Sequence, residues 1–127
     1  MTTTYRCFLV FLFFILNLPI SSAIRPDEAM KKKSEHAQSI FKYLAVGDLA
    51  KVQSEAAAIE KLLVDENTTG RPEKYLEYGK ELLRIVRTLK DTAAKQNFTG
   101  SYYEFSKMSA VCFTCHEHLR APKADDK

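Results

Sequence analysis

The chain has 127 residues, a length that suits one domain, and 46% of them are hydrophobic. Its 19 lysine and arginine residues stand against 16 aspartate and glutamate residues, which gives a formal net charge of +3. This balance excludes both the basic surplus of a nucleic-acid-binding protein and the charge imbalance of a disordered chain. We therefore expect a single folded domain with no nucleic-acid partner.

Residues 1–23 have the pattern of a secretory signal peptide. Arg6 gives a short positive region, residues 7–20 are nearly all apolar, and residues 21–23 are small enough for a cleavage site. The alternative is an uncleaved anchor, but the apolar run is shorter than the roughly 20 residues that a membrane-spanning helix needs. We expect export, cleavage at the end of this segment, no stable membrane span afterwards, and a mature domain of residues 24–127.

Two amphipathic helices are predicted in the first half of the mature domain. The first runs from about Pro26 to Val46 and ends at Gly47, and Asp48 is a natural N-cap for the second. Apolar residues recur in both at the spacing of one helix face. These are Met30, Ala37, Ile40, Phe41 and Leu44 in the first helix, and Leu49, Val52, Ala56, Ile59 and Leu63 in the second.

A polar break at residues 65–70 precedes a third predicted helix, which Pro72 begins. Gly79 interrupts good helix formers and costs about 1 kcal/mol relative to alanine. It either allows close approach of a neighbouring helix or a flat cofactor, or is a tolerated exposed glycine, and the sequence leaves both possibilities open. The stripe of this helix comprises Leu76, Gly79, Leu82, Val86, Leu89 and Ala93.

A fourth helix is predicted after a break at residues 97–100. Ser101 and Glu104 have the spacing of a capping box, and Pro122 should end the helix. Both thiols of this segment are expected to face the core, because they share one seam with apolar residues. The seam comprises Phe105, Met108, Cys112, Cys115 and Leu119.

The four segments together predict an all-α fold. None alternates with the two-residue period of a β-strand, and the connections between them are short. Four helices joined in this way pack as an antiparallel up-down-up-down bundle. A cofactor site between facing helices is common in this architecture, so we expect a four-helix bundle with room for a cofactor in its core.

Cys112, Cys115 and His116 form the pattern Cys-x-x-Cys-His, which is typical of haem attachment. Each thiol can add to a haem vinyl group as a thioether, and the adjacent imidazole can bind the iron. On a helix the three residues fall within an arc of about 100°, so one face can hold all three bonds. The sequence therefore predicts one covalently attached haem c.

The two cysteines have two alternative interpretations, a redox pair and a zinc site. A thioredoxin-like redox pair needs a βαβ pattern, which the chain lacks. A zinc site could add His116 and His118 to the two thiols, but four ligands within seven residues of one helix cannot easily surround a metal. Removal of the leader takes Cys7 with it, which leaves no cysteine for a structural disulfide.

A haem motif on the last helix of a four-helix bundle resembles the class II c-type cytochromes, which include cytochrome c′ and the low-spin cytochrome c-556 type. The likeness extends to Arg120 after the motif and to Met30 early in the first helix. It implies that Cys112 and Cys115 form the thioethers, that His116 is the proximal iron ligand and that Met30 is the distal one.

The family resemblance and helix geometry also suggest roles or positions for four further residues. Arg120 either pairs with a haem propionate or is an ordinary cation near a helix C-terminus. Met108 shares a helix with His116 and cannot easily reach the opposite side of the iron. His118 should face solvent, and His36 is expected at the surface, with bis-histidine ligation as a minority alternative.

The function expected from these residues is periplasmic electron transfer by a haem with both axial positions filled, and not enzymatic catalysis. The alternative is a five-coordinate cytochrome c′-like protein in which Met30 is core and the open iron binds nitric oxide or another small gas. A third class is an exported helical protein with a zinc or redox cysteine pair. We expect a periplasmic redox partner protein, and the family likeness implies a possible homodimer.

Overall fold

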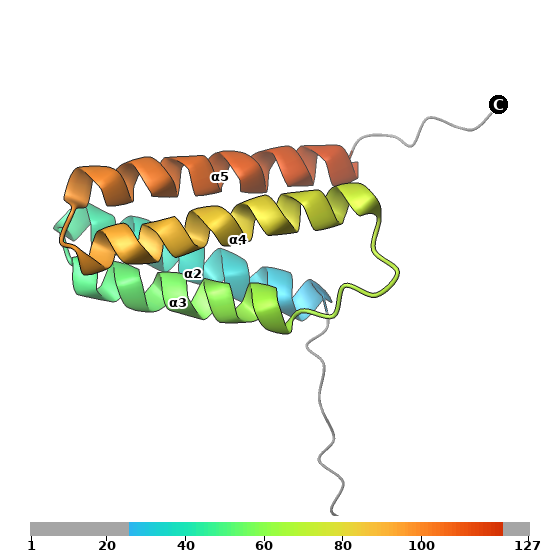
Figure 1. The fold of residues 1–127 in the computed structure, drawn as a ribbon, viewed down its shortest axis with the longest axis horizontal. Helices are drawn as coiled ribbons and strands as arrows, with labels where there is room; N and C mark the ends of the chain where they lie inside the picture. Colours follow the sequence, from blue (N-terminus) through green and yellow to red (C-terminus); the bar gives the residue numbers. More distant parts are fainter. Residues whose placement is uncertain (1–25, 121–127) are drawn as a thin grey trace, which may run out of the picture.

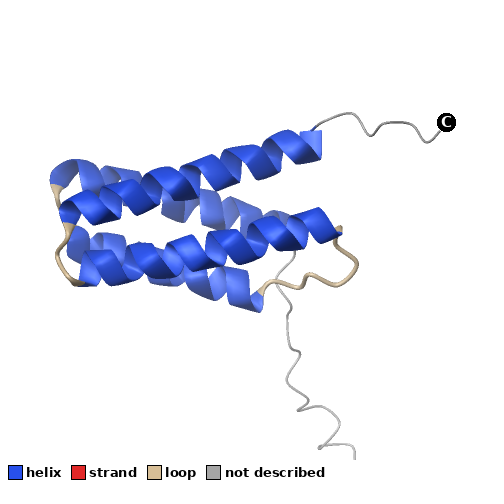
Figure 2. Ribbon diagram, turned by 45° about the horizontal axis from the view of Figure 1, so that its top comes forward, coloured by secondary structure: helices blue, strands red, loops and turns tan. Residues whose placement is uncertain are grey.

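The computed structural model describes residues 26–120, and these form four α-helices with no strand among them (Figure 1). Successive helices run in opposite directions and lie side by side, joined by the short loops drawn in tan in Figure 2. The all-helical, bundle-like fold predicted from the sequence is confirmed. The helices are α2 (Pro26–Val46), α3 (Leu49–Asp65), α4 (Glu73–Ala94) and α5 (Phe98–Arg120).

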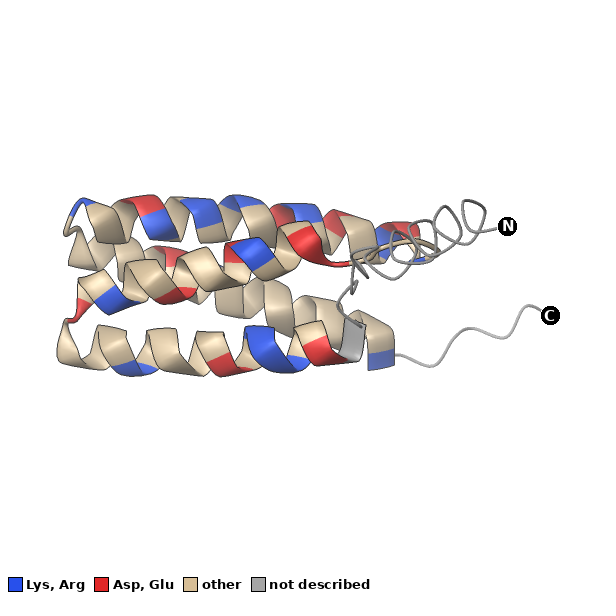
Figure 3. Ribbon diagram, turned by 90° about the horizontal axis from the view of Figure 1, so that it is seen from below, with Lys and Arg blue, Asp and Glu red and all other residues tan. Residues whose placement is uncertain are grey.

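The predicted leader, Pro122 and the C-terminal tail lie outside the described residues. Within residues 26–120, none of the helices has both the length and the apolar character that crossing a membrane would require. Lysine, arginine, aspartate and glutamate residues are scattered along the bundle rather than gathered in one patch of a single sign (Figure 3).

The turn between α2 and α3 forms where the sequence predicted it. Gly47 has a φ of +75°, which places it in the left-handed region that glycine adopts without a steric penalty. Asp48 then caps α3, because its side chain accepts a hydrogen bond of 3.1 Å from the backbone N–H of Lys51. The residues of the turn are therefore enough to determine where α2 ends and where α3 begins.

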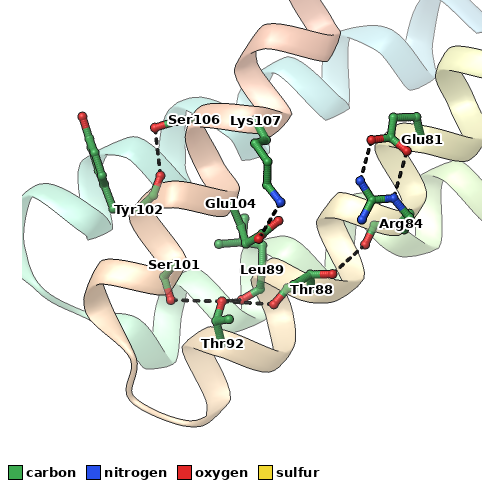
Figure 4. Close-up of polar contacts among 10 residues, drawn as sticks. All are labelled: Glu81, Arg84, Thr88, Leu89, Thr92, Ser101, Tyr102, Glu104, Ser106 and Lys107. Carbon is green, nitrogen blue, oxygen red and sulfur yellow. Dashed lines mark hydrogen bonds and ion pairs between the residues drawn. The ribbon is translucent and has the colours of Figure 1, made fainter.

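The predicted start of the last helix is wrong by one turn. Helix α5 begins at Phe98, and Asn97 caps it by accepting a 2.9 Å hydrogen bond from the N–H of Gly100. Ser101 lies inside the helix and is fully buried, with its hydroxyl 2.8 Å from the Asn97 carbonyl that accepts its proton. Glu104 closes no capping box but pairs with Lys107 at 2.7 Å, as Figure 4 shows.

The core follows most of each predicted stripe, with some differences. Phe41 was expected on the inner face of α2 but is 64% exposed. Leu62 is more deeply buried than Leu63, and Ile85 joins Val86 on the inner side of α4. Leu119 is 51% exposed, because the last turn of α5 lies at the end of the bundle. The central cluster of buried residues comprises Ile40, Leu44, Leu49, Val52, Ala56, Ile59, Ile85, Val86, Leu89, Ala93 and Met108.

Candidate cofactor site

A cavity of about 160 Å³ lies among the four helices near the end of the bundle where α2 begins and α5 ends. Most of its lining is apolar, including Ile59, Leu63 and Leu82 from α3 and α4. The same cavity is lined by four of the five residues that the sequence analysis named for haem binding, Met30, Cys112, Cys115 and His116, whereas Arg120 is not among its lining residues. The fold therefore gathers around one space the residues that the sequence placed on two helices.

Both motif thiols face this space, as the helical seam predicted. Cys115 is buried and Cys112 is half-buried, and both are free thiols. Burial raises the pKa of each thiol above its usual value, and the nearby Lys33 ammonium opposes that rise. The thiols are therefore held largely protonated in an apolar environment on the inner face of α5.

His116 and Met30 lie against each other at the cavity. The Nε2 atom of His116 is 3.3 Å from the Sδ atom of Met30, although the two residues are 86 positions apart in the chain. His116 is exposed and Met30 is half-buried. Helices α2 and α5 pack together less closely than the other neighbouring pairs.

Gly79 of α4 lines the cavity. A β-carbon added to this glycine would meet no atom within 4 Å, so no neighbouring helix approaches it closely. Of the explanations that the sequence left open, close helix packing therefore does not apply. The open space beside this half-buried position agrees with both remaining explanations, room for a flat cofactor and a tolerated glycine.

A buried polar cluster of Lys33, Glu66 and Tyr75 forms one wall of the cavity, and the sequence analysis missed it. The Lys33 ammonium donates a 2.8 Å hydrogen bond to Glu66, and the Tyr75 hydroxyl donates to the other oxygen of the same carboxylate. Burial, followed by this hydrogen bond, raises the pKa of Tyr75. One signal was available: Lys33 is three residues after Met30 and four before Ala37, so it occupies the apolar face of its helix.

Replacement of Glu66 by glutamine should destabilise the fold by about 3–5 kcal/mol. The side chains of Lys33 and Glu66 are only 8% and 3% exposed, so the substitution leaves a buried ammonium without its counter-charge. Chemical denaturation of the two proteins measures the difference. Asp65→Asn is the matched control, because Asp65 is a neighbouring acid in an exposed pair with Lys61 and should cost at most about 1 kcal/mol. Equal costs for the two variants would mean that the Lys33–Glu66 pair is not buried in solution.

The other candidate residues of the sequence analysis lie elsewhere or play other parts. His36 does not line the cavity, and its Nδ1 atom lies 2.5 Å from Glu55 of α3. His118 is exposed, with its ring centre 6.1 Å from that of Tyr78. Met108 is fully buried and lines the same cavity as the two thiols. The Arg120 side chain donates a 3.2 Å hydrogen bond to the carbonyl of His116. Arg120 thus caps the end of its own helix.

Among the described residues, no group of three or more histidine, cysteine, aspartate or glutamate side chains is placed to hold a metal ion. In this part of the chain, His116 and Met30 bring an imidazole nitrogen and a thioether sulfur into contact.

Comparisons with protein-family models, with characterised proteins and with solved structures gave no match.

Proposed function

We propose that this chain is an exported electron-transfer cytochrome with one covalently attached haem c. Cys112 and Cys115 would hold the haem through thioethers, and His116 and Met30 would be its two axial ligands. The observation that supports this most directly is the 3.3 Å approach of His116 Nε2 to Met30 Sδ beside a cavity lined by both thiols. A histidine–methionine pair is a known axial set of c-type haem and raises its reduction potential.

The chain's own residues would provide three things to such a carrier. The two thiols fix the cofactor permanently, so an exported protein cannot lose it by dissociation. The apolar lining, which includes Ile59 and Leu82, keeps water away from the bound group. His116 and Met30 would together hold the metal, which would leave no position on it for a substrate. When bound, the haem supplies the redox chemistry, one electron at a time between ferric and ferrous iron.

Location and partner belong to the same proposal. The signal-peptide pattern of residues 1–23 supports export to a periplasm, which is a compartment where c-type haem is attached. His116 is exposed, so the proposed site lies close to the protein surface. A redox partner protein could therefore exchange electrons with it without entering the bundle. We assign no catalytic residue and no enzymatic reaction.

The ultraviolet–visible spectrum of the purified mature protein tests this proposal. We expect a c-type haem spectrum that is low-spin in both oxidation states, together with weak near-infrared absorption from an iron–sulfur bond in the oxidised protein. Reduced protein should not bind carbon monoxide readily, because both axial positions are filled. A colourless protein that contains stoichiometric zinc would contradict the proposal and favour the metal-binding cysteine pair.

A further inference from the structure

The pattern Asn-x-Thr occurs twice in the chain, at Asn67 and at Asn97. In exported proteins the asparagine of this pattern can accept an oligosaccharide on its side-chain amide. The proposed electron transfer uses neither asparagine. The structure places the two in different backbone conformations, and this difference separates them as acceptors.

Asn67 lies in the longest connection between the four helices, residues 66–72, which extends beyond the ends of α3 and α4 (Figure 1). Residues 67–70 are all exposed. The Oδ1 atom of Asn67 accepts a 3.0 Å hydrogen bond from the backbone N–H of Thr69, so the acceptor pattern forms an Asx turn. Gly70, with a φ of +75°, then turns the chain back toward α4. An enzyme can therefore reach this pattern without unwinding a helix.

The amide nitrogen of Asn67 is available for reaction. The turn uses only the oxygen of this amide, and the nitrogen donates to no other group within residues 26–120. The preceding residue, Glu66, is buried and bonds to Lys33 in the cavity wall, whereas Asn67 is exposed. A group attached to Asn67 would therefore extend into solvent and would not compete with a cofactor for the cavity.

Asn97 has a structural task that conflicts with modification. It caps α5 by accepting a 2.9 Å hydrogen bond from the N–H of Gly100, and Phe98 and Thr99 are already helical. Its amide nitrogen lies only 2.6 Å from the point that a β-carbon on Gly100 would occupy, so the amide packs against the first turn of the helix. An enzyme that binds this copy of the pattern would have to unwind that turn.

The charges that precede the two asparagines also differ. Asp65 stands two residues before Asn67, and Lys95 stands two residues before Asn97. Asp65 is exposed at the end of α3 and pairs with the exposed Lys61. Such a surface pair is weak, so the carboxylate remains available to a cationic surface of an enzyme docked on the loop. The lysine before Asn97 would repel the same surface.

We propose that Asn67 is a site of N-linked glycosylation, modified by an oligosaccharyltransferase that uses a polyprenyl-diphosphate-linked oligosaccharide. The Asn67 amide nitrogen forms a bond to C1 of the first sugar, while the bond from that carbon to the diphosphate oxygen breaks. The diphosphate leaves with the electron pair of the broken bond, and the amide gives up one proton to the enzyme. In the cell this modification rests on the export that the proposed function includes, but not on haem.

Incubation of the purified mature protein with a bacterial periplasmic oligosaccharyltransferase and its lipid-linked donor tests the proposal. Trypsin then separates the two sites, because Asn67 lies in peptide 62–74 and Asn97 in peptide 96–107. Mass spectrometry should show one added oligosaccharide on the first peptide and none on the second. The protein is supplied folded and without its leader, so the result does not depend on export. The absorbance at the haem band in the same sample reports the proposed function separately.

Variants of the two threonines test the assignment to one copy of the pattern. Thr69→Ala should abolish the modification although Asn67 is still present, and Thr69→Ser should restore it, because serine also completes the pattern. Thr99→Ala is the matched control, since it removes the same residue from the other copy and should leave the modification unchanged. Circular dichroism should show that all three variants keep their helix content.

Lys95→Asp tests whether backbone conformation selects the site. This variant gives Asn97 an acidic residue at the same distance that Asp65 has from Asn67. The folded variant should still be unmodified at Asn97, whereas a synthetic peptide of residues 93–101 with the same substitution should accept the oligosaccharide, because it has no packed helix to unwind.

Three results would overturn the proposal. The first is a 62–74 peptide of the unmutated protein that carries no oligosaccharide. The second is an oligosaccharide that remains on this peptide in the Thr69→Ala protein. The third is transfer to Asn97 in the folded Lys95→Asp protein, which would show that the cap on α5 does not protect that asparagine.

Discussion

The variant Cys112→Ala/Cys115→Ala should mature without any covalently attached haem, whereas the unmutated protein should exceed the mass of its polypeptide by one haem. After removal of the leader these are the only thiols in the chain, so no other residue can form a thioether. The expected effect is complete loss, measured as the intact mass of the mature protein after extraction with acidic organic solvent. Thr114→Ala is the matched control, because Thr114 lies between the two cysteines but is exposed, and its variant should keep the haem.

Two results would contradict covalent attachment. One is haem that leaves the unmutated protein during the extraction. The other is a double alanine variant that carries the same mass of bound haem. Circular dichroism of the variant is needed beside the mass, because Cys115 is buried in the cavity wall and its truncation removes packing as well as a thiol.

The fold was predictable wherever a helix boundary depends on neighbouring residues. Gly47 and Asp48 stop one helix and start the next through backbone conformation and a side-chain cap, and both signals are local. The start of α5 was not predictable in the same way, because Asn97 and Ser101 both suit an N-cap. The packing of the bundle decided between them by burying Ser101 inside the helix.

The depth of burial was predictable only to within one helical position. Spacing identifies an apolar arc, but the neighbouring helices determine which part of that arc lies deepest. Thus Leu62 is more deeply buried than Leu63, although Leu63 still packs against the core and lines the cavity, and Ile85 joins Val86 in the core. Leu119 has the spacing of a core residue, yet it lies where the bundle ends. The spacing of apolar residues along one helix does not show where the neighbouring helices end.

The gathering of Met30 and the motif residues around one cavity was predictable from their helical spacing and from a topology that makes α2 and α5 neighbours. Their part in binding haem stays a prediction. The Lys33–Glu66–Tyr75 cluster was not predicted, since its members come from one helix, a loop and a second helix. Glu66 stands in a polar break that resembles an ordinary exposed loop. Only the folded chain brings its carboxylate back to the Lys33 ammonium.

The second large effect is expected from Met30→Leu, which removes the proposed sulfur ligand while nearly conserving side-chain volume. Met30 on α2 and His116 on α5 face each other at the cavity, so a metal between them would have one ligand from each helix. Loss of the thioether should leave one axial position open. Met108→Leu is the matched control, because Met108 also lines the cavity but lies on the same helix as His116.

The Met30→Leu protein should change from low-spin to high-spin in its absorption spectrum, lose the near-infrared band of the iron–sulfur bond, and bind carbon monoxide when reduced. The Met108→Leu protein should keep the unmutated spectrum. If the unmutated protein is already high-spin and takes up carbon monoxide, Met30 is core filling and the gas-binding alternative replaces electron transfer. If Met30→Leu stays low-spin, another side chain holds the sixth position. His36 would then be the next residue to replace, and since it pairs with Glu55 in this structure, such ligation would require α2 to turn.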